Sequence, residues 1–192
     1  MLERYLIDCC SPTLASLKTG SLFNYTFAGN EDFDGIIERW NDDFSTRGLH
    51  VYVLRRTRTG ALIYVYRESS LLRVLGDRDV LDFLAAYGYC EMRCNIDCYL
   101  EHLKYRILTL SDGHDSMKFP HEIGIFLGYP LCDVTGFIRY KGSNCKCLGD
   151  WKVYGDEEQA EKKFAQFTKC RNAYRSLWES GRRSVMQLTV AG

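Results

Sequence analysis

The residues best suited to chemistry lie in one apolar stretch, Phe119 to Ile138, with the sequence FPHEIGIFLGYPLCDVTGFI. His121 and Glu122 stand side by side near its start. A histidine changes charge near neutral pH and can act as a base or as an iron or haem ligand. Two polar side chains beside so apolar a stretch need hydrogen-bond partners whether or not they belong to a site. Either Glu122 satisfies a helix start and His121 caps a loop, or the two residues belong to a site.

Cys10 is a second candidate because it precedes a Ser-Pro pair that predicts a short helix over residues 11–20. Unpaired N–H groups and the dipole at a helix start would lower the pKa of its thiol. If His121 lay within hydrogen-bond reach and Glu122 or Asp133 oriented its ring, the set would form a thiol nucleophile with its base. A buried, inert thiol is the alternative, because free cysteines are among the most buried residues.

Four potential metal ligands recur at every fourth position: Cys90, Cys94, Cys98 and His102. Thiolates with an imidazole suit zinc or an iron cluster. Ligands spread along about 18 Å of helix, at about 1.5 Å per residue, cannot all reach one ion, which argues against a single site. Cys145 and Cys147 would share one face of a strand, but such a pair is more often incidental. The identity of any metal stays open.

Several cations on two predicted hairpins could bind a phosphate or a carboxylate, although solvated faces more often explain such charges. They are Arg55, Arg56, Arg58, Lys146 and Lys152. Tyr129 and Trp151 are expected to flank a cleft beside His121, with Asp133 as a further ligand-binding candidate. The chain contains no Gly-rich phosphate loop and no HExxH or GxSxG pattern.

The stretch that carries His121 is expected to form two short helices with a bend between them. Pro120 suits the first position of a helix that Gly128 ends, and Pro130 opens the second helix. A strand is less suitable because both of its faces would be apolar.

Two hairpins are predicted, one from Leu49–Arg56 with Ala61–Arg67 and one from residues 142–148 with 150–154. In most of the remaining chain the apolar residues recur at helical intervals, which predicts helices there. This pattern predicts an α+β fold with a small antiparallel sheet built from two hairpins and covered by several helices. Neither hairpin leaves room for the crossover helix of a parallel sheet.

Length and composition predict one cytosolic domain over residues 1–192. Apolar residues make up 46% of the chain. Its 25 basic residues balance its 25 acidic ones, so no net positive charge attracts nucleic acid or an anionic membrane as a partner. No apolar run is long enough to span a bilayer, and the first residues do not read as a secretion signal. The nine cysteines are then expected to be reduced thiols.

Several blocks together resemble the DUF3793 family, a domain of unknown function found mainly in anaerobic Firmicutes. They are Cys10–Ala15 with Lys18, Val53–Arg56, Ala61–Tyr66, Phe119–Gly124, Gly136–Ile138 and Trp151–Tyr154. The resemblance implies a single compact domain, an anaerobic host and a loose association with iron and flavodoxin genes, but no activity. Lys18, which accompanies the first of these blocks, is a further ligand-binding candidate.

The leading hypothesis is an accessory protein that holds a small ligand, such as haem, iron or a flavin-type group, in a cleft beside His121, Tyr129 and Trp151. An apolar block with few polar groups is typical of such pockets. The alternatives are a thiol enzyme that uses Cys10 with His121, and a module that presents the Phe119–Ile138 bend to a protein partner.

Overall fold

The computed structural model describes residues 2–27, 32–89, 95–110 and 119–191. The chain divides into two compact units: unit 1 comprises Met1–Ser70 with Phe167–Gly192, and unit 2 comprises Leu71–Gln166. Two helices, α3 (Glu68–Leu75) and α8 (Glu157–Glu179), each contain a boundary between the units.

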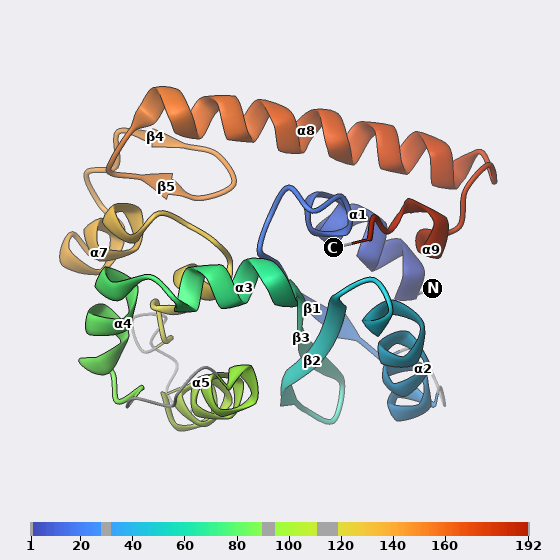
Figure 1. The fold of residues 1–192 in the computed structure, drawn as a ribbon, viewed down its shortest axis with the longest axis horizontal. Helices are drawn as coiled ribbons and strands as arrows, with labels where there is room; N and C mark the ends of the chain where they lie inside the picture. Colours follow the sequence, from blue (N-terminus) through green and yellow to red (C-terminus); the bar gives the residue numbers. More distant parts are fainter. Residues whose placement is uncertain (1, 28–31, 90–94, 111–118, 192) are drawn as a thin grey trace. The chain divides into compact units, whose positions relative to one another are not determined.

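Unit 1 is built on a three-stranded antiparallel sheet with the strand order β1-β3-β2 (Figure 1). The predicted first hairpin is confirmed as β2 (Leu49–Arg56) and β3 (Gly60–Arg67). The strand β1 (Gly20–Thr26) was not predicted, and it pairs with β3 from Gly20 opposite Tyr66 onward. As the central strand, β3 is buried along its whole length, which explains its continuous run of β-branched and aromatic residues.

Helices α1 (Leu2–Leu14), α2 (Phe33–Ser45) and α9 (Val185–Leu188) complete unit 1. Helix α1 packs against β1 and β3, and α2 packs against β2. The core that they enclose is mostly aliphatic and aromatic, and its fully buried members include Leu6, Cys10, Leu14, Leu49, Ile63 and Val65. Burial of this surface is the main term that stabilises the unit.

The helix predicted over residues 11–20 has the wrong bounds. Helix α1 begins at Leu2 and carries Pro12 inside its last turns. Leu6, Cys10 and Leu14 repeat at intervals of four on its buried face, and this stripe extends the helix upstream of the proline. The helix ends at Leu14; beyond it, Ser16 has a left-handed φ of 59°, and Leu17 N–H bonds to Pro12 O at 2.8 Å.

Arg67 ties the end of α1 to the sheet, although it is 0% exposed. Its guanidinium donates to the carbonyl oxygens of Thr13 and Arg47, each at 2.8 Å, and also to that of Leu14. Two of these carbonyls lie in the last turn of α1, where the dipole favours a cation, and each also accepts a backbone N–H, from Ser16 and Val190 respectively. Burial lowers the pKa of Arg67, and in the described part of the chain the three carbonyl oxygens are its hydrogen-bond acceptors.

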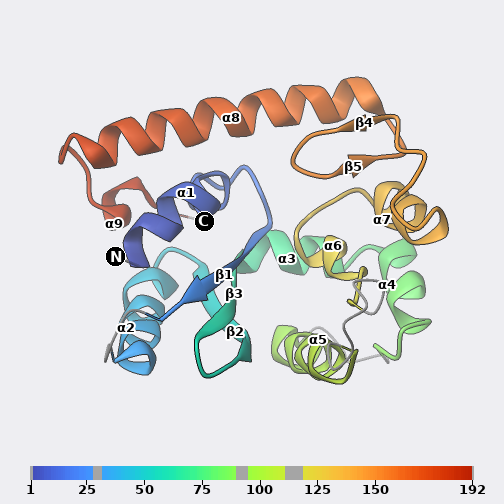
Figure 2. The same ribbon diagram turned by 180° about the vertical axis from the view of Figure 1, so that it is seen from behind.

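Unit 2 contains α4 (Arg78–Ala85), α5 (Ile96–Leu110), α6 (Ile123–Phe126), α7 (Leu131–Arg139) and a two-stranded sheet, β4 (Cys147–Leu148) with β5 (Lys152–Val153). The second predicted hairpin is therefore confirmed, with shorter strands than expected. Figure 2 shows it beside α7, and β5 contacts that helix. No helix of the described residues is long and apolar enough to cross a membrane.

The two short helices predicted for the central stretch are confirmed as α6 and α7. Gly128 adopts a φ of 78°, a left-handed conformation that glycine tolerates best. Its N–H bonds to Ile125 O and the N–H of Tyr129 bonds to Gly124 O, both at 2.9 Å, which is the hydrogen-bond pattern of a Schellman helix end. The bend therefore has one defined conformation.

Candidate functional site

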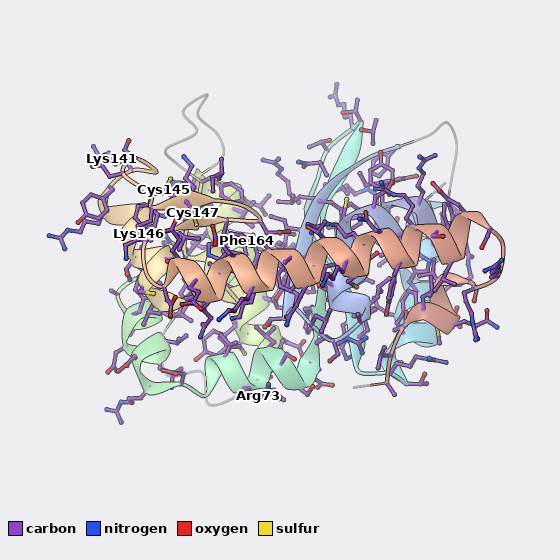
Figure 3. The ribbon with its side chains drawn as sticks, turned by 90° about the horizontal axis from the view of Figure 1, so that it is seen from above. Arg73, Lys141, Cys145, Lys146, Cys147 and Phe164 are labelled. Atoms are coloured by element: carbon purple, nitrogen blue, oxygen red, sulfur yellow. The ribbon has the colours of Figure 1, made fainter. Side chains whose placement is uncertain are left out.

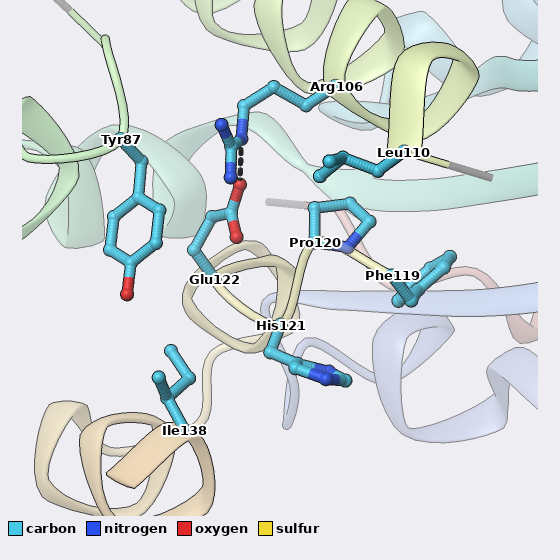
Figure 4. Close-up of a pocket in the computed structure, with 8 residues that line it drawn as sticks. All are labelled: Tyr87, Arg106, Leu110, Phe119, Pro120, His121, Glu122 and Ile138. Atoms are coloured by element: carbon cyan, nitrogen blue, oxygen red, sulfur yellow. Dashed lines mark hydrogen bonds and ion pairs between the residues drawn. The ribbon is translucent and has the colours of Figure 1, made fainter. Parts of the chain in front are cut away.

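A pocket of about 280 Å³ lies beside His121 in unit 2 (Figure 4). Leu110, Phe119, Pro120 and Ile138 give it apolar walls, and its polar lining comes from Tyr87, Arg106, His121 and Glu122. These residues come from four segments: the turn after α4, helix α5, the turn that leads into α6, and helix α7.

A buried ion pair forms one wall of this pocket. The Glu122 side chain is 1% exposed and that of Arg106 is 22% exposed, and Arg106 Nε donates to Glu122 Oε1. The hydroxyl of Tyr89 donates to the same oxygen at 3.4 Å. Burial opposes the charge on Arg106, but its hydrogen bond to Glu122 and the carboxylate charge outweigh burial and raise the pKa of Arg106. Glu122 thus has its partner, and it makes no side-chain cap at the start of α6.

The guanidinium of Arg106 keeps donors for another molecule. It lies over the ring of Tyr87 at 5.2 Å, a cation–π contact that fixes its orientation. An arginine carries about five N–H donors in a planar fork. Its Nε donates to Glu122, and the Tyr89 hydroxyl is a second hydrogen-bond neighbour of the guanidinium. The remaining N–H groups suit a carboxylate or carbonyl oxygen.

His121 lies half-buried among aromatic rings. Its imidazole meets the edge of Phe137 at 4.8 Å between centroids, and the ring of Phe119 lies at 6.5 Å. Burial lowers the pKa of His121 from its ordinary value, and the charge of Glu122 opposes that shift. The imidazole is therefore mainly neutral at neutral pH, where one ring nitrogen donates and the other accepts.

The pocket suits a small organic molecule better than the cofactors expected from the sequence. Its volume lies at the low end of the roughly 300–1,000 Å³ typical of ligand sites. That volume suits a ligand the size of a substituted benzene ring. Across the described residues, no group of three or more His, Cys, Asp or Glu side chains could hold a metal ion.

Cys10 lies in unit 1, whereas His121 and Glu122 lie in unit 2. The Cys10 side chain is 0% exposed in the core, in the C-terminal half of α1 and not before a helix start. Burial raises the pKa of its thiol, and the nearby charge of Cys9 adds to this, whereas Lys18 opposes it. The expected lowering of the thiol pKa is thus reversed, because it depended on the wrong helix boundary.

Tyr129, Asp133 and Trp151 come together in unit 2, as a packing cluster. Trp151 stacks on Tyr129 at 4.9 Å between centroids and meets the ring of Phe164 edge-on at 4.5 Å. Asp133 is 3% exposed and accepts a hydrogen bond from Trp151 Nε1 at 2.7 Å. The other oxygen of Asp133 accepts the backbone N–H groups of residues 154 and 155, each at 2.7 Å. These contacts hold the hairpin to α7 and to the start of α8.

The four cationic ligand-binding candidates lie in different places. Lys146 donates to Gly155 O at 2.6 Å and Lys152 donates to Gly142 O at 2.7 Å, so both brace loops of unit 2. Arg55 lies in unit 1 at a register irregularity of β2, and Lys18 follows the end of α1 in the same unit. None of the four lines the pocket beside His121.

The cysteine pattern gives no combined site within the described chain. Cys90 and Cys94 lie outside the described residues. Cys98 is exposed, whereas His102 is half-buried with its Nε2 at 3.1 Å from Tyr87 O. Figure 3 shows Cys145 and Cys147 on the hairpin near the start of α8; both are half-buried free thiols.

The comparison with protein families decides the assignment. The model of the family described as "Protein of unknown function (DUF3793)" matches residues 6–189. The chain belongs to the DUF3793 family. No curated protein and no solved structure matches it. For this DUF3793 protein the match extends over both units, and the description assigns no activity.

Sequence reasoning missed the partners of Glu122 in this DUF3793 protein. Arg106 was not singled out, although it adjoins the buried stripe formed by Leu103 and Ile107 on α5. A charged residue at the edge of a buried helix face needs hydrogen-bond acceptors or an opposite charge nearby, and that was the available signal. Tyr89 gave no signal, because it precedes α5 and meets Glu122 through tertiary contact alone.

Proposed function

We propose that this protein binds a small organic ligand in the pocket beside His121, one with an aromatic or apolar body and a single carboxylate or carbonyl group. The observation that carries the proposal is the Arg106 guanidinium, which is fixed by Glu122 and keeps N–H donors at the wall of an otherwise apolar pocket. Apolar walls with few oriented polar groups are the usual composition of ligand sites.

The polar groups of the pocket are held in place before any ligand arrives. The Arg106–Glu122 ion pair and the ring of Tyr87 fix the guanidinium, while Phe137 supports the imidazole of His121. Because these side chains have already lost their freedom, a ligand would not have to order them. An aromatic body would replace water against Phe119, and its acceptor would reach Arg106.

Two other functions remain weaker proposals. A thiol enzyme that uses Cys10 has little support, because its thiol is fully buried and burial raises the pKa of that thiol. A module that offers the bend of residues 119–138 to a protein partner also has little support, since Ile123–Phe126 is buried. We propose a cytosolic location, which the seven free cysteines of the described chain favour, with neither nucleic acid nor membrane as partner.

The test is isothermal titration of the full chain with a panel of small aromatic carboxylates, such as benzoate, phenylacetate and indole-3-acetate. We expect at least one to bind, and to bind at least about fivefold more weakly to Phe119→Ala and His121→Ala, a loss of about 1 kcal/mol. His50→Ala in unit 1 is the matched control and should bind normally. Absence of binding across the panel, or full affinity in both pocket variants, would refute the proposal.

A further inference from the structure

Unit 2 contains a second pocket, of about 460 Å³, which shares no lining residue with the pocket beside His121. It forms where the end of α3 and the start of α4 meet the bend after α6 and the first turns of α8. Its volume lies within the usual range for small-molecule sites. The ligand proposed beside His121 does not occupy it.

The floor of this second pocket is apolar and already fixed. Tyr129 stacks on Trp151, its hydroxyl donates to Asp150 O at 3.3 Å, and the bend at Gly128 holds its backbone. Val80 and Leu131 supply aliphatic surface beside it. A flat, rigid floor of this kind suits an apolar or aromatic side chain.

The rim of the second pocket carries charges of both signs. Arg73 and Lys163 line it, and within the described part of the chain neither makes a hydrogen bond or an ion pair. Asp77 and Asp79, at the start of α4, also line the pocket. One oxygen of Asp77 is used as the helix cap, since it accepts the N–H of Asp79 at 2.9 Å.

This charge arrangement discriminates among ligands. A simple anion would be attracted by the two cations and repelled by the two carboxylates. A simple cation would be attracted by the carboxylates and repelled by the cations. A zwitterion pairs with both kinds of charge. The pocket therefore favours a molecule that carries a carboxylate and an ammonium group on an apolar body.

We propose that the second pocket binds a free α-amino acid with an apolar or aromatic side chain. Its carboxylate faces Lys163 and Arg73, and its ammonium group faces Asp79. Its side chain lies on the floor formed by Tyr129. This proposal is independent of the ligand proposed beside His121, since the two pockets have separate linings.

The experiment titrates the full chain with each of the common amino acids by isothermal calorimetry. The strongest binder is then compared with its analogue without the amino group and its analogue without the carboxylate; for L-phenylalanine these are 3-phenylpropionate and phenethylamine. We expect each analogue to bind at least about fivefold more weakly, because each loses one charged contact.

Matched variants locate the binding. Lys163→Met and Asp79→Asn should each weaken it at least about fivefold. Lys162→Met and Asp82→Asn should leave it unchanged, because these neighbours pair with Glu158 and Arg78 and do not line the pocket. The proposal fails if no amino acid binds, if either analogue binds as tightly, or if Lys163→Met and Asp79→Asn keep full affinity.

Discussion

The substitution Arg106→Met should strongly destabilise the protein, because it removes the cation that faces a carboxylate only 1% exposed. Loss of one partner of a buried pair costs about 3–5 kcal/mol, because the other charge stays buried and uncompensated. Arg106 itself is 22% exposed, so water can replace part of its contribution and we expect about 3 kcal/mol. This is a large share of the roughly 5–15 kcal/mol that stabilises a typical fold.

Urea denaturation followed by circular dichroism measures this loss, and a double variant tests its cause. Arg106→Met with Glu122→Gln should be more stable than Arg106→Met alone, because an uncharged amide costs less to bury than an unpaired carboxylate. Lys162→Met removes an exposed pair, with side chains 69% and 80% exposed, and should leave the midpoint unchanged. A loss below about 1 kcal/mol for Arg106→Met, or no recovery in the double variant, would refute the reasoning.

Three further predictions follow from other parts of the structure. Asp133→Asn should lower the free energy of unfolding by about 2–3 kcal/mol in urea denaturation, because one amide oxygen cannot replace both carboxylate oxygens; an unchanged midpoint would show that the cluster is not a brace. Since burial lowers the pKa of His121 below 6.5, the unfolded chain takes up a proton that the folded chain resists, so stability should fall from about pH 7 to pH 5. His121→Gln should reduce this loss of stability between pH 7 and pH 5. An equally large loss in the variant would show that other titrating groups cause it. Iodoacetamide should alkylate exposed Cys98 at least about tenfold faster than Cys10 by mass spectrometry, because burial raises the pKa of Cys10; equal rates would contradict its burial.

The sequence predicted the elements that local patterns determine. Proline at the start of a helix and glycine at its end were enough to predict α6 and α7 with the bend at Gly128. The hairpin of β2 and β3 followed from its β-branched runs and its glycine turn. The α+β class was correct for the same reason.

The errors arose where a local signal competed with burial. The Ser-Pro pair suggested a helix start, but Leu6 and Leu14 place a buried stripe on both sides of it and α1 runs through. Strand β1 was missed although Phe23 and Tyr25 alternate with exposed residues. Its partner is β3, some forty residues further along the chain.

The candidate site was predicted only in part for the same physical reason. His121 and Glu122 were identified by their contrast with the apolar run around them, and both line a pocket. Arg106 and Tyr87 come from other segments, and a single sequence contains no signal for contacts that depend on packing. Trp151 and Asp133 were expected at the ligand, and what the structure shows of them is a hydrogen bond that braces the hairpin.

The most direct test of ligand binding beside His121 is a nuclear magnetic resonance spectrum of the histidine rings, recorded with and without the strongest-binding aromatic carboxylate. The chain has four histidines, so the ring signals can be resolved, and the signal of His121 is assigned by its loss in His121→Gln. We expect the His121 ring signal to shift on ligand addition while that of His50, in unit 1, stays in place. A His121 signal that does not move at saturating ligand would contradict binding in the pocket beside it.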